Sequence, residues 1–469
     1  MTEILTWVYV VAAVVLLFGA AVFVHEFGHF WMARRRGMKV EAFAIGFGPK
    51  ILGWTKDGIE YSWRWIPAGG FVKLPQMITA EALEGKSAGE VPPASPWSRI
   101  LVAFAGPFMN IVFGFAIATL IYFVGLPVPV NPSVIGYVEP GSPEAKLGIQ
   151  QGDLIVEVNG KPVKSWQEVQ TETILARTNI TSVVIDRKGV RTTYQLTAQV
   201  NEALGGLKML NLDPQDHPEV LEVTAGAAAE AAGIKPNDVV INFAGMPIFS
   251  REQLIDLIKK RASEPTEIRV QRGDQKIALT VTPRSDPTTK VGRIGVVLTS
   301  NSKMVYRVDK PGPTPWQNMI DVVDQTVRIL SALVHSKQTG VKASDFSGPV
   351  GILGMLALWL KTDYRLALNF LVLLNINLAI INLFPMPVLD GGHILMAIVE
   401  KIRRRPLSAR FQEYTTTAFA VLLISLMLYV TFFDIKRLPL FRSMFKRDAQ
   451  IEQTEKAPGT PAVTPAPAK

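Results

Sequence analysis

The sequence predicts a polytopic α-helical membrane protein with four transmembrane helices, two inserted α+β domains and a membrane-associated β-hairpin region. Three observations support this fold class. The chain of 469 residues is 48% hydrophobic, with a mean hydropathy of +0.23, which is too apolar for an ordinary soluble protein. Its charged residues gather between long apolar windows. A segment of this charged middle part is repeated at an offset of 85 residues.

Four apolar windows of about 20 residues are long enough to cross the hydrocarbon core of a bilayer. They cover residues 7–30, 100–124, 366–383 and 414–433. The first window is longer than the apolar core of a signal peptide, and its basic cluster follows it instead of preceding it. We therefore expect this window to remain as a membrane anchor.

Two basic clusters orient the windows by the positive-inside rule. "RRRGMK" follows the first window and "KIRRR" follows the third, and together they account for much of the net charge of +9. The segment 125–365 is then external, which in a bacterial inner membrane means periplasmic. The basic segment after Ile435 opposes this topology, because four crossings leave it outside. The short apolar stretch 348–360 is interpreted as interfacial or re-entrant. No pattern in the chain indicates nucleic-acid binding.

The repeat consists of residues 145–163 and 230–248, which align without gaps. Each copy is expected to form a turn, a strand, a glycine turn and an amphipathic helix, followed by closing strands. The two units resemble a tandem pair of PDZ domains, which implies binding of an extended peptide along a strand edge. Neither copy has an obvious glycine-rich carboxylate-binding loop. Gating by size, recognition of another kind of segment and a role as spacers therefore all stay open.

Two histidines and a glutamate end the first apolar window, in the stretch "VHEFGHFW". His25 and His29 are four residues apart, so on a helix both reach one metal ion, while Glu26 is placed to take a proton from a water molecule. Ionisable groups in a membrane span are costly, which favours a functional site over a histidine pair that only joins helices. The chain has no cysteine, so a metal must be held by His, Asp or Glu.

A third ligand is expected near the end of the third window, where "NLFPMPVLDGGH" offers Asp390 and His393. The first and third windows run in the same direction, so Asp390 reaches a depth near the inner face similar to that of the two histidines. Two prolines precede it and interrupt helical hydrogen bonding, which exposes backbone to a cavity. We prefer Asp390 to His393, and we exclude His217 and His335 because they lie in the external segment.

These residues resemble the site-2 protease family of intramembrane zinc metalloproteases and, within it, the bacterial regulator-of-sigma-E protease group with two PDZ domains. The resemblance covers nearly the whole chain. It is carried by "HEFGH" at residues 25–29, by the PDZ tandem, and by a motif made of Asn382, Pro385, Pro387, Leu389, Asp390 and Gly391.

By this resemblance His25, His29 and Asp390 hold zinc (Zn²⁺), and Glu26 is the general base and acid. Asn382 pairs with the substrate backbone, assisted by Asn377, and Pro385 and Pro387 belong to the same substrate-binding segment. An unwound substrate helix needs such hydrogen-bond partners within the membrane. Asn382 as a packing contact between helices is the alternative.

Between the first two windows, residues 42–75 combine alternating aromatic residues with paired glycines, which predicts hairpins. The stretch resembles the family's membrane-associated β-hairpin loop, which adds an edge to the substrate. Trp54, Trp63 and Trp65 could equally be interfacial anchors. "GPFMN" at residues 106–110 resembles a family motif in the second span, where small residues permit close helix packing.

The chain is therefore divided into nine parts. They are the first transmembrane helix (1–33), the cytoplasmic-side hairpin or re-entrant loop (34–99), the second transmembrane helix (100–124), the first PDZ domain (125–215), the second PDZ domain (216–305), amphipathic or interfacial helices (306–362), the third transmembrane helix (363–400), the fourth (410–434) and a tail that is disordered at its end (435–469).

The resemblance implies a zinc endopeptidase that cuts single-span membrane proteins near the cytoplasmic face of the bacterial inner membrane, in regulated intramembrane proteolysis and the envelope stress response. Its substrates would be an anti-sigma factor already trimmed by a first protease, or remnant signal peptides. Trimmed substrate or peptide would meet the PDZ domains, which exclude untrimmed ectodomains by size. A membrane-bound adaptor and a proton-coupled transporter are the rival functions. All four site residues are present, which counts against the adaptor, and no membrane repeat supports a transporter.

Overall fold

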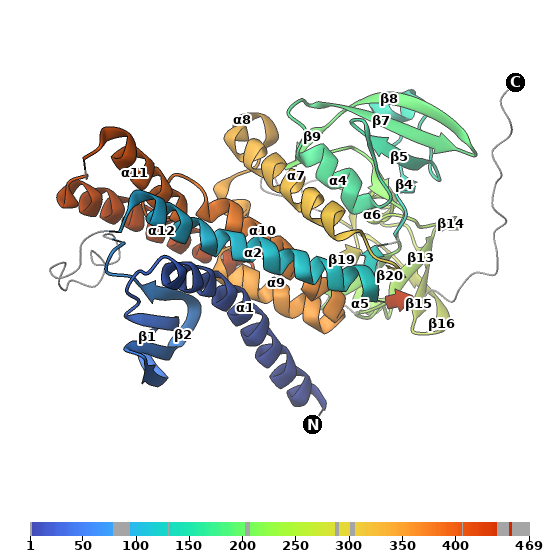
Figure 1. The fold of residues 1–469 in the computed structure, drawn as a ribbon. Helices are drawn as coiled ribbons and strands as arrows, with labels where there is room; N and C mark the ends of the chain where they lie inside the picture. Colours follow the sequence, from blue (N-terminus) through green and yellow to red (C-terminus); the bar gives the residue numbers. More distant parts are fainter. Residues whose placement is uncertain are drawn as a thin grey trace, which may run out of the picture.

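The computed structural model describes residues 2–77, 94–129, 131–201, 207–286, 290–300, 305–405, 407–438 and 450–452. Figure 1 shows a bundle of long helices with two sheet-containing modules at one end and a hairpin near the other. The long helices are α1 (Thr2–Arg35), α2 (Pro96–Val124), α7 (Pro315–Val334), α9 (Pro349–Thr362), α10 (Tyr364–Asn382), α11 (Asp390–Arg403) and α12 (Ala409–Lys436). The disordered tail end predicted from the sequence falls mostly outside the described residues.

Five helical segments of the described chain are long and apolar enough to cross a membrane, one more than the four predicted. The additional segment is Ala343–Thr362, which contains α9. The 14 residues of α9 alone rise about 21 Å, less than the roughly 30 Å of a hydrocarbon core. The segment Ala343–Thr362 is therefore long and apolar enough to be a candidate span, but α9 itself is too short to cross the hydrocarbon core fully.

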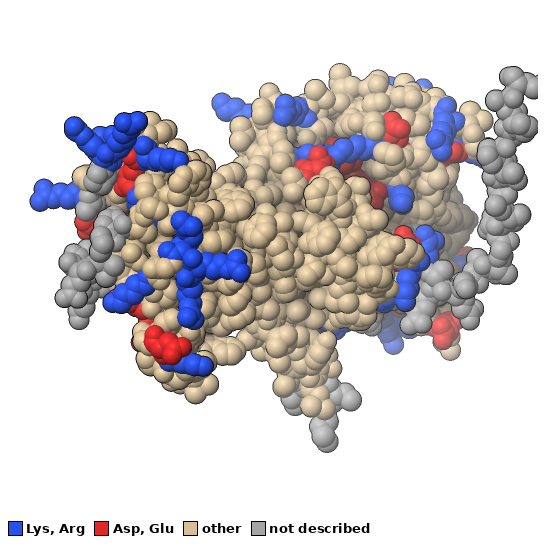
Figure 2. All heavy atoms as spheres, viewed as in Figure 1, with Lys and Arg blue, Asp and Glu red and all other residues tan. Residues whose placement is uncertain are grey.

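The surface of the bundle supports a membrane setting. Figure 2 shows a wide middle zone almost free of charged side chains, with Lys and Arg gathered at the end that carries α11 and at the end that carries the modules. Such an apolar belt can lie in lipid, because the backbone N–H and C=O groups of each helix bond to one another and need no water. The chain is accordingly a multi-pass membrane protein.

The stretch predicted as hairpins forms a hairpin of two strands, β1 (Ala42–Lys56) and β2 (Ile59–Lys73), in which residues 42–45 of β1 pair with both 60–63 and 70–73 of β2. Asp57 and Gly58 make its turn, both with positive φ, as a two-residue hairpin turn requires. Residues 42–45 therefore lie between two segments of β2, and the hairpin folds into a small sheet. It packs against the end of α1, which brings it next to the histidines.

The insertion between α2 and α7 starts and ends at one place, because β3 (Leu126–Pro129) pairs with β20 (Val305–Asp309). β20 also pairs with β21 (Gln450–Glu452) near the C-terminus. Paired strands at its root allow the insertion to fold as a separate body beside the bundle.

The insertion contains two similar modules. The first has a sheet in the order β6-β5-β7-β8, and the second has a sheet in the order β16-β15-β13-β12-β19, with β14 paired to β13. Their strands are β5 (Leu154–Val158), β6 (Lys161–Pro162), β7 (Ile180–Arg187), β8 (Val190–Thr197), β12 (Pro218–Val223), β13 (Val239–Phe243), β14 (Met246–Pro247), β15 (Thr266–Arg272), β16 (Gln275–Val281) and β19 (Val296–Ser300). Each module has its own apolar core.

Shorter elements complete the modules and their connections. The helices are α3 (Pro143–Lys146), α4 (Trp166–Ile174), α5 (Ala228–Ala231), α6 (Arg251–Lys259), α8 (Ser336–Thr339) and the 3₁₀ turn η2 (Ala343–Asp345). The strands are β4 (Ile135–Tyr137), β9 (Gln199–Asn201), β10 (Leu207–Met209), β11 (Asp213–Pro214), β17 (Arg284–Ser285) and β18 (Gly292–Arg293). Ser165 and Ser250 cap α4 and α6 at equivalent positions, in agreement with the repeat.

Helix α7 joins the first module to the bundle. One side of it packs on α2 and α10. Its other side reaches the first module, where both guanidinium nitrogens of Arg328 donate to the carboxylate of Glu172 at 2.8 and 2.5 Å. Helix α7, which corresponds to the amphipathic helix predicted after the modules, therefore contacts the bundle on one side and the first module on the other.

Candidate metal centre

Helix α1 presents His25 and His29 on one face, one turn apart, near its basic C-terminal end. Their Nε2 atoms lie 3.2 Å apart. Both side chains are largely buried, with 15% and 12% of their surface exposed. The predicted spacing of four residues thus brings two ring nitrogens to one point.

Asp390 begins α11, directly after a loop that follows the last residue of α10. This loop folds back so tightly that a methyl group at Gly391 would overlap the carbonyl of Leu383, and one at Gly392 would overlap that of Met386. Only glycine fits such a close backbone approach. The Asp-Gly-Gly sequence is therefore what lets α11 start beside the histidines.

The three side chains predicted as ligands meet. Asp390 places Oδ2 3.4 Å from His25 Nε2 and Oδ1 3.5 Å from His29 Nε2. Within the described residues, these three form the one group of His, Asp or Glu side chains with the proximity that a metal site needs. Zinc binds nitrogen and oxygen at about 2.0–2.1 Å in a tetrahedron, so two of its ligand atoms lie about 3.3 Å apart. The observed separations match this value, and the donor set fits a zinc ion.

Helix α2 holds the outer side of this group. His29 Nδ1–H donates to the carbonyl of Val102 at 2.8 Å, and the Asn110 amide nitrogen lies 3.1 Å from His25 Nδ1. A methyl group at Gly106 would overlap His29 Nε2. The "GPFMN" motif, predicted only to allow helix packing, therefore leaves room for one histidine and supplies a contact to the other.

Glu26 lies beside the histidines on α1 and faces the hairpin. A methyl group placed on Gly70 of β2 would come 2.7 Å from the backbone oxygen of Ala44 and 2.9 Å from Glu26 Cγ. The glycine thus permits the second strand of the hairpin to pass directly over the glutamate. Glu26 is half-buried, so its carboxyl group lies in a confined space next to the candidate ligands.

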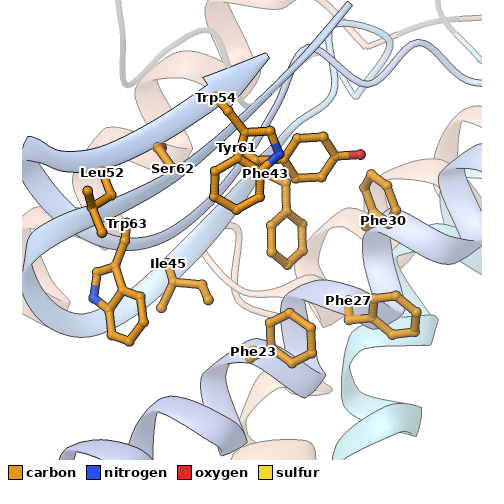
Figure 3. A pocket seen from close by; sticks show the side chains of 10 residues that line it. All are labelled: Phe23, Phe27, Phe30, Phe43, Ile45, Leu52, Trp54, Tyr61, Ser62 and Trp63. Carbon is orange, nitrogen blue, oxygen red and sulfur yellow. The ribbon is translucent and has the colours of Figure 1, made fainter. Parts of the chain in front are cut away.

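An apolar cavity of about 280 Å³ opens between α1 and the hairpin. Figure 3 shows Phe23, Phe27 and Phe30 rising from the helix toward the strands, with aromatic side chains of the hairpin facing them. Trp54 and Trp63 line this cavity, although 63% and 48% of their surface is exposed. Their predicted roles as substrate edge or interfacial anchor both remain compatible with this position.

The other predicted residues lie along α10 and the following loop. Asn382 ends the helix and is half-buried, while Pro385 and Pro387 lie in the loop before Asp390. Asn377 faces away to α7, where its amide oxygen accepts a hydrogen bond of 2.6 Å from Thr326. Its assistance to the substrate stays a prediction.

The remaining histidines contribute nothing to the group. His217 contacts the carbonyl of Ile248 in the second module, and His335 contacts that of Ser331 on α7. His393 follows Asp390 on α11 and lies outside the candidate ligand set. The preference for Asp390 over His393 agrees with this geometry.

Comparison with known proteins assigns the chain to a family. The family model described as "Peptidase family M50" matches residues 13–426. The chain belongs to peptidase family M50. It is 31% identical to a Vibrio cholerae protein named "Putative zinc metalloprotease" over 93% of this chain and 100% of that one. It is 29% identical to "Regulator of sigma-E protease RseP" of Escherichia coli K12 over 92% and 100%.

These comparisons confirm the predicted resemblance to the site-2 proteases of the regulator-of-sigma-E type. As a member of family M50, the protein is a metalloprotease. The "Regulator of sigma E protease" of Salmonella typhi is 29% identical over 91% of this chain and 98% of that one. Among solved structures, the PDZ domain of an SdrC-like protein of Listeria monocytogenes covers 18% of this chain and 88% of its own at 19% identity, with a TM-score of 0.17.

Proposed function

We propose that this chain is an intramembrane zinc endopeptidase in which His25, His29 and Asp390 hold the metal. The observation that carries the proposal is the separation of 3.2 to 3.5 Å among their nitrogen and oxygen atoms, which is that of tetrahedral zinc ligands. The family membership and the names of the relatives support zinc as the ion. Three protein ligands leave one position open, as catalytic zinc sites do.

Glu26 is the general base and acid of the proposed reaction. When bound, zinc would supply Lewis-acid polarisation of the scissile carbonyl and a lower pKa for the attacking water. Glu26 takes a proton from that water, and the water oxygen bonds to the carbonyl carbon. The glutamic acid then returns the proton to the nitrogen of the breaking amide bond, so that a carboxylic acid and an amine leave.

The substrate backbone would be held by Asn382 at the end of α10, with the Pro385 to Pro387 loop beside it. A transmembrane helix must unwind before its amide bond can be cut, and each freed amide then needs a partner. The side chain of Asn382 offers both a donor and an acceptor. The aromatic cavity next to the hairpin gives the unwound segment an apolar wall.

The proposed substrate is a single-span protein of the anti-sigma class after trimming outside the membrane, with remnant signal peptides as a second class. The relatives named as regulators of sigma E support this choice. We place the protein in the bacterial inner membrane, with the Lys- and Arg-rich end that carries α11 on the cytoplasmic side. In this topology α9 does not cross fully, and the two modules are periplasmic PDZ domains that meet trimmed substrate.

The test is cleavage of a tagged single-span substrate in membranes by wild-type protein and by Glu26→Gln. We expect the variant to lose cleavage by about 10²- to 10⁴-fold, the range of a general acid–base contribution, while it keeps its zinc. Glu267→Gln, which changes an exposed pair with Arg269 in the second module, is the matched control and should cut normally. Normal cleavage by a folded, zinc-loaded Glu26→Gln protein would refute the proposal.

A further inference from the structure

Each of the two candidate histidine ligands has a second ring nitrogen, Nδ1, on the side away from Asp390. A neutral imidazole carries one hydrogen, so a ring that binds metal through Nε2 must carry its hydrogen on Nδ1. That N–H needs an acceptor, which orients the ring and fixes its tautomer. In both histidines Nε2 faces Asp390, so both rings need an acceptor at Nδ1.

His29 has this acceptor in the carbonyl of Val102 on α2, at 2.8 Å. A backbone carbonyl can only accept, so it permits a single tautomer of the ring. The position of His29 is therefore fixed by the main chain of the neighbouring helix.

His25 has a side chain, not a backbone carbonyl, at the equivalent place. The group at its Nδ1 is the amide of Asn110, two turns further along α2, at 3.1 Å. Asn110 is completely buried, and its Oδ1 has no hydrogen-bond partner among the described residues. A buried amide oxygen without a partner costs roughly 1–3 kcal/mol, so its presence beside a ligand calls for a partner.

A half-turn of the amide about its last torsion exchanges the places of its oxygen and nitrogen. Oδ1 then lies where Nδ2 lies, within hydrogen-bond distance of His25 Nδ1. This single rotation gives the unpaired oxygen a donor and gives the Nδ1–H of His25 an acceptor. The same bond pairs both of these atoms, and Nδ2 moves to the place that Oδ1 leaves.

We propose that Asn110 is a positioning residue that fixes His25 as the Nε2-binding tautomer by accepting a hydrogen bond from its Nδ1–H. The inference rests on the proposed metal site and deepens it. Asn110 touches neither substrate nor metal and acts through His25 alone. The two ligands of α1 are thus held by two different kinds of oxygen on α2, one from the backbone and one from a side chain.

The experiment is a zinc competition titration against a chelator, with full-length protein in nanodiscs. Asn110→Leu keeps the size of the side chain and removes the acceptor, and we expect zinc affinity to fall about 10- to 100-fold. Asn110→Asp restores an acceptor without a donor and should bind zinc like wild type, because the bond to Nδ1–H is kept. Cobalt-loaded protein gives a second readout, because a displaced His25 changes its visible absorption.

Asn375→Leu is the matched control. Asn375 is also completely buried, also has an unpaired Oδ1 among the described residues, and lies on α10 with its amide nitrogen bonded to the carbonyl of Leu371. We expect its loss to leave zinc affinity unchanged. A general cost of removing a buried asparagine would instead appear in both leucine variants.

Two results would overturn the inference. If Asn110→Leu binds zinc like wild type, the acceptor has no role, and if Asn110→Asp fails as badly as Asn110→Leu, the amide nitrogen or the packing matters instead. The metal site itself is tested separately by His25→Ala. Loss of zinc in that variant together with full affinity in Asn110→Leu would leave the proposed function intact and reject only the role of Asn110.

Discussion

Two regions of the protein contain buried aspartates with different kinds of partner. In the second module Asp238 is fully buried and accepts two hydrogen bonds from Arg272, at 2.7 Å each, and one from the backbone N–H of Lys235. The first module repeats this arrangement 85 residues earlier with Asp153 and Arg187. In the bundle, Asp390 faces two imidazoles instead.

The difference between the partners distinguishes a structural carboxylate from the carboxylate that we propose as a metal ligand. An arginine is always charged and its guanidinium group matches the geometry of a carboxylate. Each Asp–Arg pair in the modules therefore balances its charge and forms its hydrogen bonds without a metal ion. The histidines beside Asp390 are neutral ligands when they hold a metal, and the group then gains its positive charge from the ion. The same residue type thus stabilises a small domain in one region and, in the function proposed above, holds the metal in the other.

The largest expected effect comes from filling the space beside a ligand. Gly106→Ala places a methyl group against His29 Nε2, so the ligand must move, and a displacement of about 1 Å costs about 100-fold in rate. Gly114→Ala, two turns further along α2, meets only the flexible tip of Ile376 at 3.2 Å. We expect Gly106→Ala to lose zinc and cleavage while Gly114→Ala keeps both, as measured by metal content and substrate cutting. Equal behaviour of the two variants would remove the steric argument.

The module pairs should affect stability without affecting the metal. Asp238→Asn removes the charge that Arg272 requires, and we expect the second module to lose about 2–3 kcal/mol of stability. Hydrogen exchange of β13 and β15 in the full-length protein measures the loss, and zinc content should not change. Asp274→Asn, in an exposed turn of the same module, is the control. A loss of zinc in Asp238→Asn would contradict the separation of the two regions.

Another carboxylate, that of Asp213, lies where the modules meet and should make that contact depend on pH. Burial raises its pKa to about 6, although the Ser250 hydroxyl donates to it and lowers the pKa in part. In the unfolded chain Asp ionises near pH 4, so about pH 4 is the lower limit of the affected range. The contribution of Asp213 to stability is therefore full below about pH 4 and is lost as pH rises through about 6, by about 1–2 kcal/mol.

Thermal unfolding of wild type and Asp213→Asn at about pH 5 and about pH 7.5 tests this dependence, because these values lie on either side of the raised pKa. The amide introduced by this substitution cannot ionise, so the variant should lose less stability than wild type between the two pH values. The same slope in both proteins would show that another group titrates.

The smallest effect is expected at the contact between the first module and α7. Glu172→Gln weakens the pair with Arg328, which is partly exposed, and should cost under about 1 kcal/mol. Distance measurements between spin labels on α4 and α7 would show a broader distribution. Zinc content should stay at the wild-type level, and a drop would mean that this contact reaches the metal site.

Much of the site could be predicted from local patterns. Helical periodicity placed His25 and His29 on one face, and the direction of the windows brought Asp390 to the same depth. Alternating aromatic residues and paired glycines predicted the hairpin. These features depend on residues close in sequence or on one rule of membrane topology, so a single sequence contains them.

The supporting contacts could not be predicted, because they join helices far apart in the chain. Val102 and Asn110 on α2 contact the histidines of α1 only because the two helices pack together. The bond between Asn377 and Thr326 likewise depends on how α7 packs against α10. The four predicted crossings left out α9 because its glycine-rich run is short. Its fixed position depends on Asp434 of α12, which accepts hydrogen bonds from the backbone N–H groups of Gly348 and Gly351.

The most direct measurement of the central claim is the zinc content of purified full-length wild type, His29→Ala and Asp390→Ala, each confirmed as folded by circular dichroism. We predict close to one zinc per chain in wild type and a strong loss in both variants, because each removes one of three ligands. One zinc per chain in all three proteins would mean that the metal lies elsewhere, and that the group formed by α1 and α11 is not the catalytic centre.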